Sequence, residues 1–238
     1  MSRIRVATYN IHSGVGVDRR FRPERVLAVI AELEADIIAL QEVLSPVAGF
    51  DVHEHLREKS GFHLATMATM QLAGGTFGNA LLSRWPIVEV VEHSISVDER
   101  EPRGALEVTI ERHSAQLRVI ATHLGLRSAE RREQLARLVT IVQRDAALPT
   151  ILAGDFNIAR AGAKEWRAHA AVLGKCDALA TFPSFAPVLQ LDRIFAAHDA
   201  TIVEIAVHRS RKARFASDHL PLLATIELRP GIPDGASV

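Results

Sequence analysis

Polar side chains at the ends of short apolar runs constrain the fold more than any other feature of this sequence. Each run has the length of a buried β-strand, and each ends on, or is interrupted by, an acid, an amide or an imidazole. The residues concerned are Asn10, Glu42, His123, Asp155, Asn157 and Asp192. A fold that gathers these strand ends would build one pocket of carboxylates, amides and imidazoles. Because unpaired carboxylates are costly to bury, such a pocket predicts a bound cation.

A second imidazole follows near the end of the chain, in Ser217-Asp218-His219-Leu220-Pro221. On its own, Asp218-His219 could simply cap the entry to a strand. Placed in the same pocket as the earlier residues, the pair would set an imidazole beside a cation. That combination is typical of phosphoester hydrolysis.

The periodicity of apolar residues predicts many strands and few helices. Helices are predicted at a segment beginning near Pro23, at about 52–59 and at about 128–144. Strands are predicted at 1–10, 36–42, 77–83, 87–97, 106–110, 117–122, 150–155, 191–196, 201–207 and 222–228. This pattern favours two packed sheets with helices outside. No linker divides the chain, so we expect one domain over residues 1–230 and a flexible tail at 231–238.

Composition indicates a globular protein with no net charge. Of its 238 residues, 48% are hydrophobic and 24% charged, with 28 basic and 28 acidic side chains. This balance argues against tight binding of duplex nucleic acid through many phosphate contacts. One basic cluster stands out, formed by Arg209, Arg211, Lys212 and Arg214. We interpret it as a solvated loop, with a rim for an anionic substrate as the alternative.

Three further features indicate a cytoplasmic protein. The single cysteine, Cys176, allows no disulfide within the chain. The N-terminal segment alternates Arg3 and Arg5 with apolar residues and lacks the uninterrupted apolar stretch of a signal peptide. No apolar run is long enough to span a bilayer, so we expect no stable membrane insertion. We predict no protein partner and a monomer.

Taken singly, the polar residues have ordinary structural interpretations. Asn10 could be a turn residue, His123 a satisfied core histidine, and the Asp155–Asn157 segment an Asx turn. Asp192 is the hardest to explain in this way, because it interrupts an apolar strand where a lone acid would need a partner. The order in which these residues occur along the chain carries more information than any one of them.

Eight segments, in this order, resemble the endonuclease/exonuclease/phosphatase superfamily. That superfamily includes deoxyribonuclease I-like enzymes, exonuclease III-like repair enzymes, neutral sphingomyelinases and inositol polyphosphate 5-phosphatases. The segments are Thr8–His12, Leu40–Val43, Gly78–Ser83, Pro102–Ala105, Thr122–Leu124, Gly154–Asn157, Leu191–Ile194 and Ser217–Pro221. The resemblance covers the chain from Arg3 to about Glu227. It implies an α/β (α+β) fold, a four-layered α/β sandwich in which two mainly antiparallel sheets pack face to face with helices on the outside.

The resemblance also implies a hydrolase that uses Mg²⁺, with Mn²⁺ as a substitute. The implied metal ligands are Asn10, Glu42 and Asp218. The implied catalytic residues are His123, Asp155, Asn157, Asp192 and His219. Within that set, Asp155 would orient or deprotonate water, Asp192 would orient His219, and His123 would donate to a phosphoryl oxygen or the leaving group. Asn79 and Arg103 are the implied substrate-binding residues, and Arg103 could equally buttress the pocket wall.

Two departures from the repair enzymes bear on function. His12 stands where they carry an acid, which argues against a second carboxylate-rich metal position, and His123 stands where they carry tyrosine. The expected function is hydrolysis of a phosphodiester by metal-assisted in-line attack of water. The substrate could be a small molecule, DNA or RNA, or a lipid head group. The least favoured alternative is a non-catalytic binding module, because Glu42, Asp155 and His219 are all present.

Overall fold

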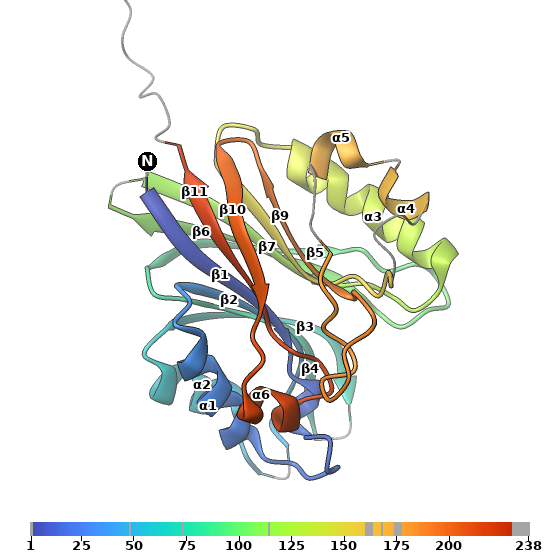
Figure 1. Ribbon diagram of the computed structural model, residues 1–238. Helices are drawn as coiled ribbons and strands as arrows, with labels where there is room; N and C mark the ends of the chain where they lie inside the picture. The colour runs from blue at the N-terminus through green and yellow to red at the C-terminus, as the bar shows by residue number, and fades with distance from the viewer. Residues whose placement is uncertain are drawn as a thin grey trace, which may run out of the picture.

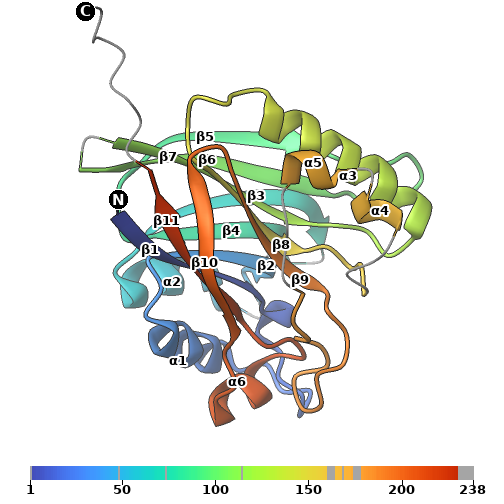
Figure 2. The same ribbon diagram turned by 45° about the horizontal axis from the view of Figure 1, so that its top comes forward.

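Two β-sheets pack face to face in the computed structural model, and helices cover both outer surfaces (Figures 1 and 2). The structure describes residues 2–47, 49–72, 74–113, 115–159, 164–167, 169–173 and 178–229. Because the two sheets pack face to face between helical layers, the four-layered sandwich expected from the sequence is confirmed. Within the described residues, no helix is both long and apolar enough to cross a membrane. The predicted tail at 231–238 lies outside the described residues.

The first sheet has six strands in the order β10-β11-β1-β2-β4-β3. All neighbours are antiparallel except β1 and β2, which run parallel. Its strands are β1 (Ser2–Asn10), β2 (Ile37–Ser45), β3 (His63–Leu72), β4 (Gly75–Ser83), β10 (Ala200–Val207) and β11 (Leu222–Leu228). The helices that pack on its outer face are α1 (Pro23–Leu33), α2 (Val52–Ser60) and α6 (Arg211–Ala216). A 3₁₀ turn, η1 (His12–Gly14), follows β1.

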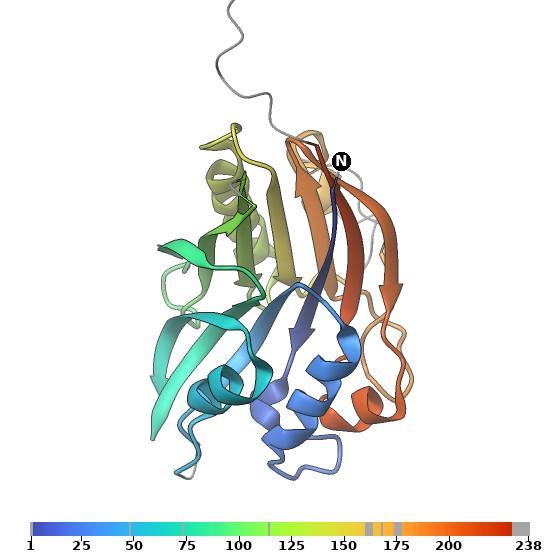
Figure 3. The ribbon, with the colours of Figure 1, turned by 90° about the vertical axis from the view of Figure 1, so that its left-hand side faces the viewer.

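The second sheet has five strands in the order β5-β6-β7-β8-β9, and only β7 and β8 run parallel. Its strands are β5 (Ile87–Ser94), β6 (Gly104–Arg112), β7 (Ala115–His123), β8 (Thr150–Asp155) and β9 (Asp192–Ala197). The long helix α3 (Ser128–Gln143) lies on its outer face, beside the short helices α4 (Lys164–Arg167) and α5 (Ala170–Leu173). Figure 3 shows the two sheets edge-on between their helical layers.

The period-two pattern of the strands explains why both faces of each sheet are apolar. In β1, Ile4 and Val6 point into the core between the sheets, whereas Ala7 and Tyr9 pack under the helices of the first sheet. The core between the sheets draws residues from both of them. We therefore propose that residues 1–230 fold as one domain.

Among the described residues, five elements were not expected from the sequence: the short elements η1, α4 and α5, the strand β3 and the helix α6. Strand β3 occupies the edge of the first sheet, and α6 follows the capping residue Ser210. The basic cluster at 209–214, interpreted from the sequence as a loop, is thus partly helical. Its positive side chains are nevertheless exposed, because α6 buries only the small residues Ala213 and Ala216.

Candidate active site

Strand register brings three of the sequence-predicted residues side by side. His123 pairs with Asp155 across the parallel strands β7 and β8, and Asp155 pairs with Asp192 across the antiparallel strands β8 and β9. The residues lie at the last position of β7, the last of β8 and the first of β9. The neighbouring strand ends of the second sheet therefore present an imidazole and two carboxylates.

The first sheet supplies the facing groups. Asn10 ends β1, and Glu42 lies in the neighbouring strand β2 at a break in its pairing with β4. Glu42 has a positive φ of 55°, a conformation that is uncommon for residues other than glycine. Such bulges re-aim side chains, and here the Glu42 carboxylate comes within reach of Asn10.

Asn10 links the carboxylates of the two sheets. Its Nδ2 donates to Glu42 Oε1 at 2.9 Å and to Asp155 Oδ2 at 3.1 Å. Its Oδ1 accepts a hydrogen bond from the backbone N–H of His12 at 3.0 Å. A metal-ligand role for Asn10 Oδ1 would therefore require the amide to rotate toward Glu42.

Asp155 is the centre of the cluster. Its Oδ2 lies 3.6 Å from Nε2 of both His123 and His219, and its Oδ1 accepts from the backbone N–H of Asn157 at 2.9 Å. The carboxylate is almost fully buried, so these neighbours, together with Asn10, provide its polar surroundings.

His219 is held by a buried carboxylate. Its Nδ1 lies 2.9 Å from Asp192 Oδ2, which also accepts a hydrogen bond from the Thr181 hydroxyl. Burial lowers the pKa of His219, but the charge of Asp192 and its hydrogen bond outweigh burial, and Asp155 and Asp218 add to them, so that the pKa rises to about 10. The imidazole is accordingly a cation at neutral pH.

His123 has the opposite electrostatic surroundings. Burial, the largest influence, lowers its pKa, and the positive charges of Arg103 and His219 lower it further against the attraction of Asp155, giving a pKa of about 3. One histidine of the site is therefore charged and the other neutral at pH 7. Such a division between two similar groups is a frequent basis for separate acid and base roles.

Arg103 and Asn157 surround His123. Arg103 Nη1 lies 3.1 Å from His123 Nδ1, and its Nη2 lies 3.1 Å from Glu101 Oε1. Asn157 Nδ2 donates to the Leu124 carbonyl at 2.9 Å and lies 3.2 Å from His123 Nε2. These contacts of Arg103 are with neighbouring protein side chains, as expected for an arginine that buttresses the pocket wall.

Asn79 and Asp218 contact other residues than Asp155 and its partners. Asn79 is buried and donates from Nδ2 to the Gly104 carbonyl at 3.2 Å, so it ties β4 of one sheet to β6 of the other. Asp218 is half-buried, with Oδ1 3.8 Å from His12 Nδ1. Burial raises the pKa of Glu42, the Asn10 hydrogen bond opposes this, and the nearby charge of Asp218 raises the pKa further.

Three residues near the site had no predicted role. Thr181 bonds Asp192, Ser217 donates to the Asn10 carbonyl at 2.7 Å, and the Phe182 ring lies 4.9 Å from the His219 ring. Ser217 lies inside a segment that carries the family resemblance, so the sequence placed it near the site. The sequence did not predict its hydrogen bond to the Asn10 carbonyl. Thr181 and Phe182 lie in an irregular segment where no periodicity marks them.

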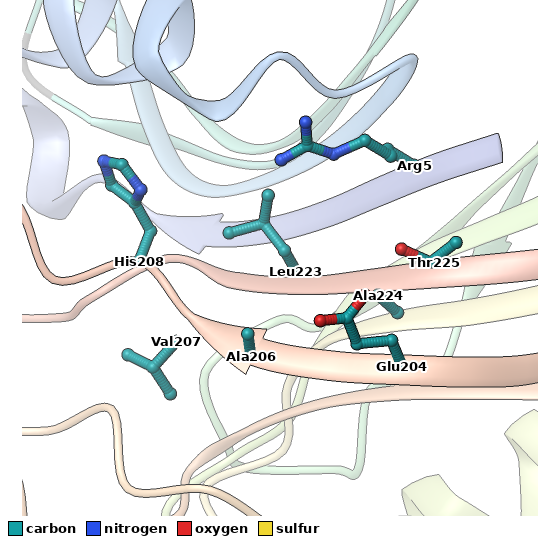
Figure 4. A pocket seen from close by; sticks show the side chains of 8 residues that line it. All are labelled: Arg5, Glu204, Ala206, Val207, His208, Leu223, Ala224 and Thr225. Atoms are coloured by element: carbon teal, nitrogen blue, oxygen red, sulfur yellow. The ribbon is translucent and has the colours of Figure 1, made fainter.

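A separate hollow lies on the outer face of the first sheet. Figure 4 shows Arg5, Glu204 and His208 around it, on β1, β10 and the segment after β10. Its volume is about 370 Å³, and none of the sequence-predicted site residues lines it. Arg5 is paired with Glu34 and His208 with Glu32. The hollow is therefore a surface feature distinct from the candidate site.

Comparison with known proteins gives a consistent family. The sequence model of the Endonuclease/Exonuclease/phosphatase family matches residues 7–219. The chain is 33% identical over 244 residues to the uncharacterized protein YbhP of Escherichia coli K12, covering 94% of this chain and 96% of that one.

Solved structures share the fold at lower identity. The catalytic domain of human Nocturnin with a bound sulfate anion superposes with a TM-score of 0.72 at 20% identity, covering 95% of both chains. The D. rerio protein TDP2, complexed with a single-strand DNA product, also superposes with a TM-score of 0.72, at 18% identity, covering 95% of this chain and 100% of that one. An endonuclease/exonuclease/phosphatase from Beutenbergia cavernae DSM 12333 has a TM-score of 0.77 at 24% identity, covering 97% of this chain and 73% of that one.

Proposed function

Because the chain belongs to the endonuclease/exonuclease/phosphatase family, we propose that it is a Mg²⁺-dependent hydrolase of a phosphodiester bond. Members of this family are generally metal-dependent phosphoesterases and nucleases. One observation carries the proposal for this chain. Asn10 bonds Glu42 from one sheet and Asp155 from the other, and Asp155 in turn lies between the two histidines.

The donor set fits a hard divalent ion. Glu42 and Asp218 are close enough for the charge of one to raise the pKa of the other, and Asn10, which bonds Glu42, adds an amide that could present its oxygen by rotating. Oxygen ligands of this kind are what Mg²⁺ prefers, and Mn²⁺ accepts them as well. A bound ion would supply charge stabilisation to a phosphoryl group.

A second group of possible ligands fits less well. Asp155, Asp192 and His219 have potential ligand atoms within 4.8 Å of one another. Asp192 Oδ2 already accepts from both His219 Nδ1 and Thr181, so an ion bound through that oxygen would break two buried hydrogen bonds, which leaves only Asp192 Oδ1, a buried oxygen with no hydrogen-bond partner among the described residues. We therefore favour Glu42, Asp218 and Asn10 as the metal residues.

The remaining side chains fit in-line hydrolysis. Asp155 would orient or deprotonate the attacking water, with Asn157 holding the water or a phosphoryl oxygen. The cationic His219, positioned by Asp192, would donate to a phosphoryl oxygen, and the neutral His123 would donate to the leaving group or to another oxygen. These groups need no covalent enzyme intermediate.

Hydrolysis of a generic aryl phosphodiester tests the proposal. Activity should require added Mg²⁺ or Mn²⁺, disappear with a chelator, and fall by about 100-fold or more in Glu42→Gln and in His219→Ala. His63→Gln, which alters an exposed histidine on β3, serves as the matched control and should retain activity. Undiminished hydrolysis by both site variants would refute the assignment.

A nuclease is the second candidate. Supporting it are the exposed arginines Arg209, Arg211 and Arg214, which lie just before Asp218 and His219 along the chain. Cleavage of plasmid or single-stranded DNA, falling steeply as salt rises, would favour this candidate. A substrate panel of DNA, RNA, lipid head groups and phosphomonoesters separates the possibilities. A non-catalytic module is disfavoured because the acids and histidines form one connected cluster.

A further inference from the structure

Several exposed apolar side chains lie on segments beside the proposed catalytic cluster. Phe185 is 67% exposed, Val188 72% and Phe215 51%, and Val17 is exposed as well. Such exposure of large apolar side chains is unremarkable for an isolated residue but informative when several lie together. Here they come from three segments that are joined by hydrogen bonds.

Backbone and side-chain contacts hold these segments together. The backbone N–H of Val17 donates to the Phe215 carbonyl at 3.3 Å. Ser184, the neighbour of Phe185, donates from its hydroxyl to the Arg214 carbonyl at 3.1 Å. The loop that carries Phe185 and Val188 therefore lies against α6, as the views of Figures 1 and 2 agree. We call the surface that carries Val17, Phe185, Val188 and Phe215, together with the neighbouring Arg211 and Arg214, the apolar–basic rim.

Positive charge accompanies the apolar side chains. Arg211 and Arg214 are exposed on α6, and Arg19 and Arg20 are exposed in the loop that carries Val17. Within the part of the chain that the structure describes, neither Arg211 nor Arg214 forms an ion pair, whereas Lys212 pairs with Glu32. Since the whole chain has no net charge, this local excess of arginine is a feature of the rim.

The rim is tied directly to the proposed catalytic residues. Ser184 donates from its backbone N–H to the Asp218 carbonyl at 2.7 Å, and Phe182 packs on the His219 ring. Whatever binds the rim would therefore lie next to the Asp218–His219 end of the site.

We propose that the apolar–basic rim docks the protein on the surface of an anionic phospholipid bilayer. Protruding apolar side chains flanked by arginines suit the boundary between anionic head groups and acyl chains. Single-stranded nucleic acid would use stacking planes and cations. Two of the four apolar side chains, Val17 and Val188, have no plane on which a base could stack, so the composition favours lipid.

Docking would set the catalytic cluster at head-group level. A preference for lipid head groups as substrate would follow from this position and rests on the proposed function. The binding of the protein to the membrane does not rest on it. Membrane binding can therefore be measured without turnover, on full-length protein in the presence of a chelator.

Vesicle cosedimentation tests the docking. The protein should sediment with vesicles of phosphatidylcholine containing phosphatidylglycerol and remain in solution with phosphatidylcholine alone. Phe185→Ser/Val188→Ser should weaken binding about tenfold or more, because two side chains lose their burial in the bilayer. Arg211→Gln/Arg214→Gln should weaken binding and flatten its dependence on salt.

The matched control changes exposed apolar residues elsewhere. Val88 and Val90 on β5 are 49% and 48% exposed, and Val88→Ser/Val90→Ser should bind vesicles as the unaltered protein does. Thermal melting confirms that each variant is folded. Equal loss of binding in the control and rim variants would overturn the proposal. So would failure to sediment with anionic vesicles, including the case where the protein instead binds a single-stranded oligonucleotide.

Discussion

Arg103 donates a hydrogen bond from Nη1 to Nδ1 of the His123 imidazole across 3.1 Å. The direction is fixed, because a guanidinium has donors only. The neutral ring must then carry its proton on Nε2, the nitrogen that lies 3.6 Å from Asp155 Oδ2. Asn157 Nδ2 also lies 3.2 Å from Nε2, but an amide nitrogen only donates and so does not accept the Nε2 proton. Arg103 thus prepares His123 to donate into the site.

Replacing Arg103 should remove the preference of His123 for the Nε2–H tautomer. In Arg103→Gln the imidazole should show a mixture of Nδ1–H and Nε2–H forms, whereas the unaltered protein should show only Nε2–H. Heteronuclear NMR of the imidazole nitrogens measures the ratio. Phosphodiesterase activity should fall by about 10- to 100-fold, as expected for a residue that orients a catalytic group.

Two variants separate positioning from general damage. Arg103→Lys retains the charge and one donor direction, so it should restore part of both the tautomer ratio and the activity. Arg132→Gln removes an exposed arginine on α3 and should change neither. A pure Nε2–H form in Arg103→Gln would show that Arg103 does not control the proton.

His219 should make the stability of the protein depend on alkaline pH. Its pKa rises from 6.5 to about 10 on folding, so its protonated form stabilises the native state fully below pH 6.5. That contribution is lost as pH rises from 6.5 toward 10. The difference in unfolding free energy between the unaltered protein and His219→Gln should therefore shrink across this window.

Denaturant unfolding at several pH values, in the presence of a chelator, measures that difference. Asp192→Asn should reduce the effect, since the charge and hydrogen bond of Asp192 raise the pKa of His219. His63→Gln, an exposed position, should show no comparable trend. A difference that grows with pH would contradict the protonated state assigned to His219.

Glu32 should make stability depend on acidic pH for the opposite reason. Its carboxylate lies 3.0 Å from His208 Nε2 and 2.9 Å from Lys212 Nζ, and so links α1 to α6 and to the segment before it. Hydrogen bonds from Ser210, His208 and Lys212 lower its pKa from 4.5 to about 2. Its stabilisation is present above pH 4.5 and is lost as pH falls toward 2.

Glu32→Gln should accordingly lose stability at pH 7 and little at pH 2. The loss at pH 7 should be about 0.5–1 kcal/mol, because the side chain is partly exposed and solvent screens the pairs. Urea unfolding at both pH values provides the comparison. Glu24→Gln, on the exposed side of the same helix, is the control. An equal loss at both pH values would mean that packing, rather than charge, explains the effect.

The sequence predicted the buried strands well, because alternation and run length reflect burial directly. The predicted end of a strand at Asp155 agrees with β8 to the residue. Strand β3 was not predicted, since its position at a sheet edge leaves much of His63–Leu72 half-exposed and blurs the pattern. Helix α6 is only six residues long, too short to show a helical period.

The hydrogen bonds between side chains of the site could not be predicted from the sequence, for a different reason. Family resemblance placed His123 and Arg103 in one pocket, but their bond depends on how β6 and β7 align, which residue types do not specify. The hydroxyl of Thr181 bonds Asp192 from an irregular segment with no periodicity. Such contacts follow from register and loop path rather than from local pattern.

Phe156 should be the main apolar anchor of the Asp155–Asn157 segment. Its ring is fully buried and lies 5.3 Å from Trp166 and 5.4 Å from Phe195. Phe156→Ala would leave a cavity between the second sheet and its helices, and should lower the unfolding free energy by about 3–5 kcal/mol. Phosphodiesterase activity should also fall at temperatures where the variant remains folded, because Asp155 loses its rigid support.

Phe185→Ala provides the matched comparison, since it truncates the same kind of ring at an exposed position. It should change the unfolding free energy by no more than about 0.5 kcal/mol. Denaturant unfolding of both variants gives the two values directly. Near-equal losses would mean that the aromatic cluster around Phe156 does not support the strand end that carries Asp155.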